Sequence, residues 1–182
     1  MKENQRIRIS KQCLRSGLIH LMRQKSIHKI SVREICTEAD INRTTFYKYY
    51  GSQYDLLKDI EDSTLSQVDN YLAEAEEKDA DFIIRVENVL VYIQSNIDLF
   101  RVLINNTIDT DFPKKIVSLP LIKQILSERF SEQYDQNEFD YIYEFIVSGG
   151  FSIIKSWINK DVRESPREIA LLMAKSIPQM FT

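Results

Sequence analysis

Apolar side chains recur along the chain at spacings of three and four residues, the period of an amphipathic helix. Leu14, Leu18 and Leu21 are one such set. Since no stretch alternates apolar and polar residues over the length of a strand, the pattern predicts an all-α fold of about nine helices. We expect these helices at 4–24, 32–39, 43–49, 53–73, 82–93, 97–104, 121–130, 137–159 and 166–177.

Polar residues mark where several of these helices begin. Ser31 and Glu34 have the spacing of a capping box, and Asn42 stands before the next predicted helix. The segment SPRE at 165–168 combines a cap, a proline at the first helical position and a capping acid. Residues 107–120 hold two prolines and no apolar period, so we expect one long loop there.

Composition excludes several classes of protein. Only 4 glycines and 4 prolines among 182 residues argue against sandwiches, barrels and glycine-rich nucleotide loops. The longest apolar run, 169–174, is far shorter than the roughly 20 residues that cross a bilayer. The charged N-terminus lacks the apolar stretch of a signal peptide, so we expect a cytoplasmic protein. Cys13 and Cys36 lie in apolar helical patterns, which favours buried thiols over a disulfide.

The charge is unevenly distributed. Residues 1–60 carry 12 Lys and Arg against 6 Asp and Glu, whereas residues 61–182 carry 12 against 21. The chain of net charge −3 thus joins a head of +6 to a body of −9. This asymmetry favours anion binding by the head, with chance clustering of solvated charges as the alternative.

Residues 31–50, SVREICTEADINRTTFYKYY, form the most informative segment. The pattern predicts a capped helix, a turn at 40–42 and a second helix too short to be stable alone. Its outward residues are cations, hydroxyls and phenols without a carboxylate, and 42–49 span roughly 12 Å, about the width of the major groove. We interpret the segment as a DNA-binding helix-turn-helix, with a plain polar hairpin as the alternative.

The predicted contacts divide by residue type. Arg43 and Thr44 open the second helix, where base edges are read, while Lys48 suits phosphate contacts. The N-terminus of the first helix can meet a phosphate directly. The candidate DNA-binding residues of the segment are Ser31, Val32, Arg33, Asn42, Arg43, Thr44, Thr45, Tyr47, Lys48 and Tyr49.

Residues 7–57 resemble the DNA-binding domain of the TetR (tetracycline-repressor) family of transcriptional regulators. The resemblance rests on the segment 31–50, on the helix opening GSQYDLL at 51–57 and on the amphipathic helix in front. It implies an all-helical homodimer, usually of nine helices per chain, whose last two helices build a dimeric four-helix bundle. We therefore expect a DNA-binding domain at 1–52 and an effector-binding and dimerisation domain at 53–182.

The sequence departs from the usual family pattern at four positions. Asp40 replaces the usual glycine of the turn, Tyr50 replaces a phenylalanine, and Gly51 replaces a frequent proline. Gln53 replaces the lysine that usually contacts a phosphate, so we include Gln53 among the candidate DNA-binding residues. The loss of one charged contact per half-site lowers affinity and reduces the salt dependence by about one ion.

The C-terminal segment SGGFSIIKSWINKDVRESPREIA is similar to the end of a short subgroup common in low-GC Gram-positive bacteria. Gly149 and Gly150 each cost a helix about 1 kcal/mol relative to alanine. They indicate a close backbone approach across a dimer or around a ligand, with a kink as the alternative. The candidate dimer residues are Tyr141, Phe145, Ser148, Ser152, Trp157, Ile169, Met173 and Ile177.

The resemblance places an effector pocket among the middle helices of the body. We take as candidates Tyr92, Phe100, Leu103, Ile104, Tyr143 and Ile146, although such side chains more often form core. These residues favour an apolar or aromatic small molecule, and a protein partner is the alternative signal. Neither the operator sequence nor the identity of the effector follows from the chain.

The residues argue against an enzyme. His20 and His28 form no metal-ligand pair, the two cysteines lack metal spacing, and no nucleophile elbow is present, so we expect no cofactor or metal. We interpret the chain as a sequence-specific DNA-binding regulator, a repressor that a small-molecule effector releases from a palindromic operator. The alternative is a helix-turn-helix adaptor that acts through a protein partner.

Overall fold

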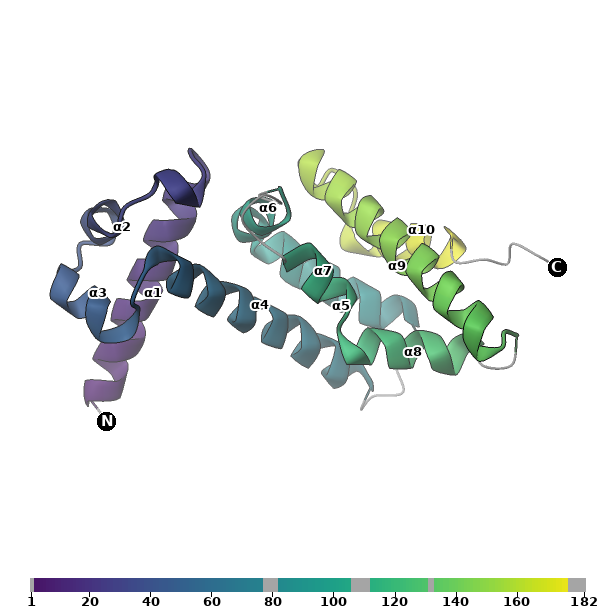
Figure 1. Ribbon diagram of the computed structural model, residues 1–182. Coiled ribbons are helices and arrows are strands. Elements are labelled where there is room, and N and C mark those ends of the chain that lie inside the picture. The colour runs from purple at the N-terminus through teal and green to yellow at the C-terminus, as the bar shows by residue number, and fades with distance from the viewer. Residues whose placement is uncertain (1, 77–81, 106–111, 131–132, 177–182) are drawn as a thin grey trace. The chain divides into compact units, whose positions relative to one another are not determined.

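The computed structural model of the protein describes residues 2–76, 82–105, 112–130 and 133–176. Within these ranges the chain forms ten α-helices and one short 3-10 turn, with no strand (Figure 1). The predicted all-α fold is confirmed. Nine of the ten helices correspond to those that the apolar spacing predicts.

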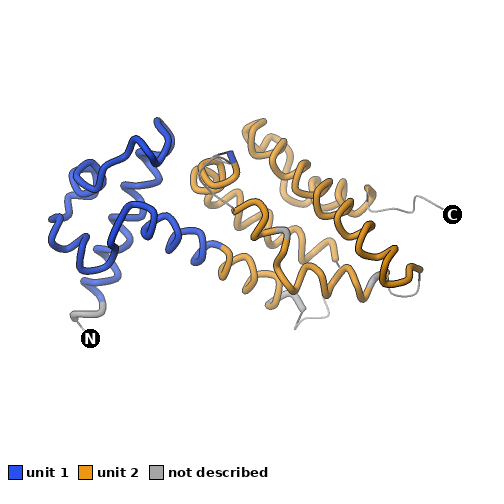
Figure 2. Tube along the Cα trace, viewed as in Figure 1, with its two compact units in different colours: residues 1–64, 105–110 blue, residues 65–104, 111–182 orange. Residues whose placement is uncertain are grey.

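The chain divides into two compact units (Figure 2). Unit 1 contains residues 1–64 and 105–110, and unit 2 contains residues 65–104 and 111–182. Helix α4, Gln53–Glu76, gives its first half to unit 1 and its second half to unit 2.

Unit 1 is built around the first helix, which packs against the next two α-helices. Leu14 and Leu18 of that helix are fully buried, together with Ile35 and Phe46. A Cβ atom placed on Gly17 would lie 3.3 Å from the backbone nitrogen of Ala39, so the first two α-helices touch closely at this glycine. Besides α4, the elements are α1 (Lys2–Met22), the 3-10 turn η1 (Ile27–Lys29), α2 (Val32–Glu38) and α3 (Arg43–Tyr49).

Unit 2 continues from α4 with further helices, of which α9 is the longest at 24 residues. Helix α10 packs along α5 and α9, and α9 also contacts α7 and α8. The N-terminus of α9 is held by a capping box, in which the Asp135 carboxylate accepts from the backbone N–H groups of Asn137 and Glu138. The helices are α5 (Phe82–Ser95), α6 (Ile97–Asn105), α7 (Phe112–Val117), α8 (Pro120–Phe130), α9 (Gln136–Asn159) and α10 (Pro166–Ser176).

The prediction of one long loop at 107–120 is wrong for part of that segment, because α7 occupies Phe112–Val117. Pro113 and Pro120 stand in the first turns of α7 and α8, where the missing N–H of proline leaves no helical hydrogen bond unmade. Phe112 is fully buried and anchors the short helix. Residues 107–111 of the expected loop lie outside the described residues.

Candidate DNA-binding surface and apolar cavity

The N-terminus of α2 carries the predicted capping box. The Ser31 hydroxyl accepts from the backbone N–H of Glu34 at 3.3 Å, and the Glu34 carboxylate accepts from the backbone N–H of Ser31 at 2.9 Å. Lys25 donates to the other carboxylate oxygen at 2.5 Å. The Lys25 ammonium, followed by the Ser31 backbone, lowers the pKa of Glu34 to about 2.

The turn between α2 and α3 fixes the angle at which α3 leaves. Asp40 has a φ of 51°, in the left-handed region that glycine enters without strain and aspartate enters more readily than most residues. The backbone N–H of Ile41 donates to the Cys36 carbonyl at 2.9 Å, and the Asn42 side chain caps α3 by accepting from the N–H of Thr44. Aspartate at position 40 is therefore compatible with the turn.

Helix α3 turns one apolar side chain inward and its polar side chains outward. Phe46 is fully buried, whereas Tyr47 is 58% exposed. No candidate DNA-binding residue is buried, and Val32, Thr45, Tyr49 and Gln53 are partly exposed. The exposed candidates are Ser31, Arg33, Asn42, Arg43, Thr44, Tyr47 and Lys48.

The structure brings several of these candidates together. Arg33, Asn42 and Arg43 line one open, polar hollow between α2 and α3. At the other end of α3, the Lys48 ammonium lies 5.9 Å from the centre of the Tyr49 ring. The cations of the segment thus lie at both ends of α3, as a surface that follows a phosphate backbone requires.

Sequence reasoning missed Lys11 of α1. Its ammonium lies 5.8 Å from the centre of the Tyr49 ring and 5.4 Å from that of Tyr50, so α1 adds a cation beside the C-terminal end of α3. Arg8, Lys11 and Arg15 follow the spacing of one helix face. That spacing is the signal that could have identified Lys11.

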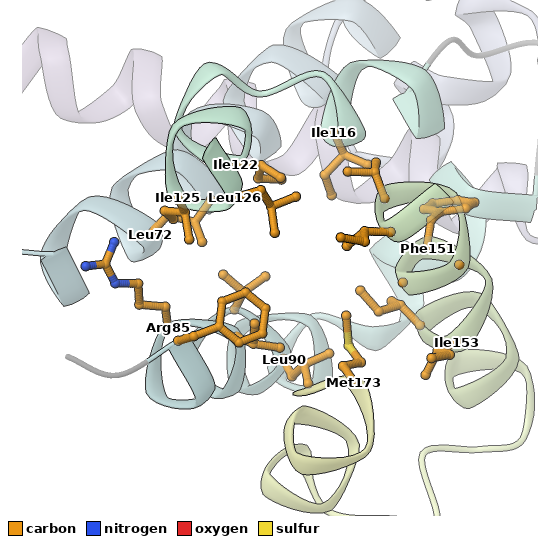
Figure 3. A pocket seen from close by; sticks show the side chains of 18 of the residues that line it. Leu72, Arg85, Leu90, Ile116, Ile122, Ile125, Leu126, Phe151, Ile153 and Met173 are labelled. Carbon is orange, nitrogen blue, oxygen red and sulfur yellow. The ribbon is translucent and has the colours of Figure 1, made fainter. Parts of the chain in front are cut away.

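Unit 2 contains a partly open apolar cavity of about 250 Å³, shown in Figure 3. Its wall combines aliphatic and aromatic side chains of all the helices from α4 to α10, among them Leu72, Leu90 and Met173. Arg85 of α5 lies at one edge of the cavity (Figure 3). Within the described wall, Arg85 is the charged residue and Ser176 adds a hydroxyl.

Two of the six candidate pocket residues, Ile104 and Ile146, line this cavity. The other four do not, because their rings and side chains pack elsewhere in unit 2. Tyr92 stacks on Tyr71 with ring centres 5.0 Å apart and meets Phe100 edge to face, while Leu103 is fully buried. Burial raises the pKa of Tyr92.

Tyr143, the last of these four, packs against a small core cluster made by α8 and α9. Its ring centre lies 6.1 Å from that of Phe139, and the Lys123 ammonium lies 5.6 Å from the ring. Burial raises the pKa of Tyr143. The buried members of the cluster are Leu126, Phe130, Phe139 and Val147.

The candidate dimer residues separate into two groups. On α9, Tyr141 and Phe145 are 80% and 60% exposed, and Ser148 and Ser152 continue the same exposed stripe. Trp157 and Ile169 are instead core residues of unit 2, at 2% and 5% exposed.

Met173 lines the cavity, as Phe145 also does, and its methyl group would be 3.2 Å from a Cβ on Gly150. A Cβ on Gly149 would meet no atom within 4 Å. Ile177 lies outside the described residues.

The part of the chain that the structure describes contains no group of three or more His, Cys, Asp and Glu side chains able to hold a metal ion. None of its helices has the length and hydropathy needed to span a membrane.

Two family models match the sequence. Residues 15–60 match bacterial regulatory proteins of the tetR family, and residues 85–179 match a transcriptional regulator C-terminal region. No curated protein sequence matches the chain.

Several solved structures share the fold. A TetR transcriptional regulator from Streptococcus agalactiae aligns with a TM-score of 0.70 and 20% identity, over 97% of this chain and 98% of that one. The dihydroxyacetone kinase operon activator DhaS aligns with a TM-score of 0.65 and 18% identity, over 92% of this chain and 93% of that one. FadR from Thermus thermophilus, a transcriptional repressor solved with lauroyl-CoA, aligns at 0.59 and 13%, over 92% of each chain.

Proposed function

The chain belongs to the TetR family of bacterial transcriptional regulators, and from this premise we propose that it is a cytoplasmic homodimeric repressor of a palindromic operator. In this proposal residues 1–52 bind DNA, while residues 53–182 bind an effector and form the dimer. Each subunit places α3 in one of two major-groove half-sites, one helical turn or a multiple apart.

The observation that carries the proposal is the division of α3 into a buried and an exposed side. Phe46 anchors the helix, and Arg43, Thr44 and Lys48 face solvent. Seven residues at 1.5 Å each give a helix of roughly 10 Å, which enters a major groove about 12 Å wide. The short helix is thus presented to DNA by its packing on α1.

The exposed stripe of α9 supports dimerisation. Tyr141 and Phe145 place two aromatic rings in solvent in the single chain, and Ser148, Gly149 and Ser152 follow them with small side chains. Large exposed aromatic surface marks an interaction site, and small residues allow another helix backbone to approach. We therefore assign this stripe to the dimer interface.

The cavity supports an effector with a hydrocarbon part and an acidic group. A cavity of about 150 Å³ holds benzene, so the larger cavity of unit 2 has room for on the order of ten carbon atoms. Arg85 at its edge suits a carboxylate or phosphate. A fatty acid combines both features, as does an acyl thioester whose thiol part carries phosphate groups, in parallel with the lauroyl-CoA bound to the T. thermophilus FadR.

Helix α4 offers the route between effector and DNA. Its residues Val68 and Leu72 line the cavity, and its N-terminal half belongs to unit 1. An effector that shifts α4 would change how the two DNA-binding units of a dimer are spaced, a coupling worth about 1–3 kcal/mol.

Selection from a random duplex library, followed by fluorescence anisotropy against the selected and a scrambled duplex, tests DNA binding. A dimer making six to ten phosphate contacts should lose about 10³–10⁵ in affinity between 50 and 200 mM salt. If the selection enriches no sequence and the library duplexes do not bind at low salt, the repressor proposal fails and an adaptor role replaces it.

Dodecanoate and dodecanol test the effector. We expect dodecanoate to raise the thermal midpoint and weaken binding to the selected duplex, and dodecanol to do so less. The variant Arg85→Gln should remove the difference between the two, whereas Ile146→Trp, which fills the cavity, should abolish both responses. Equal responses in all three proteins would show that neither compound uses the cavity.

A further inference from the structure

Two side chains from different parts of unit 1 donate hydrogen bonds to one carboxylate oxygen of α4. Arg15 of α1 donates to Asp59 Oδ2 through Nε at 3.0 Å and through Nη2 at 2.8 Å. The Tyr50 hydroxyl donates to the same oxygen at 2.6 Å. Arg15 Nη1 also donates to Ser63 Oγ at 3.4 Å, which adds a second contact with α4.

Tyr50 is the residue at which α3 ends. Its backbone N–H closes the last turn by donating to the Phe46 carbonyl at 2.9 Å, and its ring centre lies 5.7 Å from the Phe46 ring. The side chain is only 5% exposed, and the Lys11 ammonium lies over its ring. Tyr50 therefore cannot shift without moving the turn that carries Lys48 and Tyr49.

The hydrogen bond from Tyr50 to Asp59 joins a phenol to an ionised carboxylate. Partial burial by itself would raise the pKa of Asp59, but the hydrogen bonds from Tyr50 and Arg15 outweigh it and hold that pKa below its ordinary value. Burial, followed by the bond to Asp59, raises the pKa of Tyr50. At neutral pH the phenol is thus the donor of a charge-assisted hydrogen bond.

We propose that Asp59 acts as a latch that holds the C-terminal end of α3 against α4 through Tyr50, and so positions Lys48 and Tyr49 for the DNA backbone. Arg15 orients the carboxylate from the α1 side. This proposal rests on operator binding by α3. Asp59, Tyr50 and Arg15 are positioning residues in it, since none of the three has to touch DNA.

Simple electrostatics predicts the opposite effect of removing the Asp59 charge. Loss of a carboxylate from a basic unit should strengthen binding to a polyanion, because the negative charge that repels the phosphates is removed. Loss of the latch should weaken binding to the operator, because the C-terminal end of α3 is no longer fixed. The sign of the change therefore separates a charge effect from a positioning effect.

The experiment compares Asp59→Asn with Asp62→Asn, the same charge change at an exposed site of α4. Tyr50→Phe is compared with Tyr54→Phe, which removes a hydroxyl that bonds His28 at 2.9 Å. Anisotropy is measured on the duplex that the unaltered protein selects from a random library and on a scrambled duplex. Circular dichroism identifies any variant that loses its helices.

We expect Asp59→Asn to bind the selected duplex about tenfold more weakly and Tyr50→Phe about threefold, since Tyr50→Phe leaves the Arg15–Asp59 pair intact. Binding to the scrambled duplex should change by less than about twofold, because non-specific binding needs no fixed α3. Tyr54→Phe should bind both duplexes like the unaltered protein, and Asp62→Asn should bind both at least as tightly. Because Tyr50→Phe retains the buried ring, we expect the circular dichroism spectrum of this variant to show the same helical content as the unaltered protein.

A folded Asp59→Asn variant that binds the selected duplex as tightly as Asp62→Asn would overturn the latch. So would an equal loss on both duplexes, accompanied by a lower thermal midpoint, since that pattern belongs to a purely structural network. If the unaltered protein selects no sequence, operator binding itself fails and the latch falls with it.

Discussion

Units 1 and 2 use their apolar side chains in different ways. In unit 1, α1, α2 and α3 close around a filled core in which Leu14, Ile35 and Phe46 are fully buried, and the hollow at its surface is polar. In unit 2 the helices surround a cavity of about 250 Å³ and leave Tyr141 and Phe145 largely exposed. Close packing alone leaves neither a cavity nor an exposed aromatic stripe. The cavity of unit 2 is therefore suited to an effector, and the stripe to a second copy of the chain.

The sharpest test of this difference truncates one isoleucine in each unit. Ile35→Ala in the filled core should lower the free energy of unfolding by about 2–5 kcal/mol, because it creates a new cavity. Ile146→Ala on the cavity wall should lower it by only about 1 kcal/mol, because fewer contacts surround that side chain. Urea unfolding followed by circular dichroism measures both. Equal losses would mean that the cavity wall is as tightly packed as the core of unit 1.

The second test asks whether DNA is recognised by unit 1 alone. Arg43→Ala should lose about 1–3 kcal/mol of discrimination at one base position of the selected duplex. Lys48→Ala should weaken selected and scrambled duplexes alike and reduce the salt slope by about one. Lys123→Ala, which removes an exposed cation of unit 2, should change neither. An unaltered sequence preference in Arg43→Ala would refute the assignment of α3 as the recognition helix.

The third test uses a motif that occurs in both units. Ser31 with Glu34 opens α2, and Ser165 with Glu168 opens α10. The hydrogen bonds from Ser165 lower the pKa of Glu168, whereas Glu34 also receives a bond from Lys25, and its pKa falls from 4.5 to about 2. A carboxyl group with a lowered pKa stabilises the fold fully above its ordinary pKa and loses that effect as the pH falls through the lowered value.

Thermal midpoints between pH 7 and pH 2 should therefore fall in the unaltered protein, mainly below about pH 4.5. Glu34→Gln should remove more of this acid sensitivity than Glu168→Gln, because the Lys25 contact is lost as well. The difference should shrink in high salt, which screens the exposed pair. An acid profile of Glu34→Gln that matches that of Glu168→Gln would show that Lys25 contributes nothing.

The parts of the fold that the sequence predicts well are those set by local signals. Ser31 with Glu34 and Asn42 cap the helices they precede, as expected, and the SPRE motif at 165–168 opens α10. Each of these signals acts within four residues of itself, so no tertiary information is needed. The same proline signal misled at Pro113 and Pro120, since a proline in a first helical turn and a proline in a loop look alike in sequence.

The cavity and the latch depend on which helices meet, and that does not follow from helical periodicity. Tyr92 and Ile146 both lie on apolar stripes, yet only Ile146 lines the cavity, because Tyr92 stacks on a tyrosine of α4. Asp59 lies 44 positions from Arg15 in the sequence, and nothing near either residue indicates their pairing. Exposed DNA-binding candidates such as Arg43 follow more directly from the sequence, because helical periodicity separates outward from inward positions.

The smallest expected effect concerns Gly149, at the junction of the cavity and the exposed stripe of α9. A Cβ at this position meets no atom within 4 Å, so Gly149→Ala should raise the stability of the chain by about 0.5–1 kcal/mol through better helix propensity. The control is Gly150→Ala, whose added methyl group presses on Met173 at 3.2 Å and should gain less. Thermal unfolding at several protein concentrations measures both variants.

The concentration series also tests the role of the exposed stripe. If Gly149→Ala lowers the thermal midpoint, and does so more strongly in dilute protein, then the added methyl group obstructs a second copy of the chain. That result would contradict the expected gain in stability and would place a partner backbone directly against α9, in the space that is open around Gly149 in the single chain. A stabilised variant with unchanged concentration dependence would instead restrict the interface to the part of the stripe around Tyr141 and Phe145, where aromatic side chains and not a close backbone approach would join the two subunits.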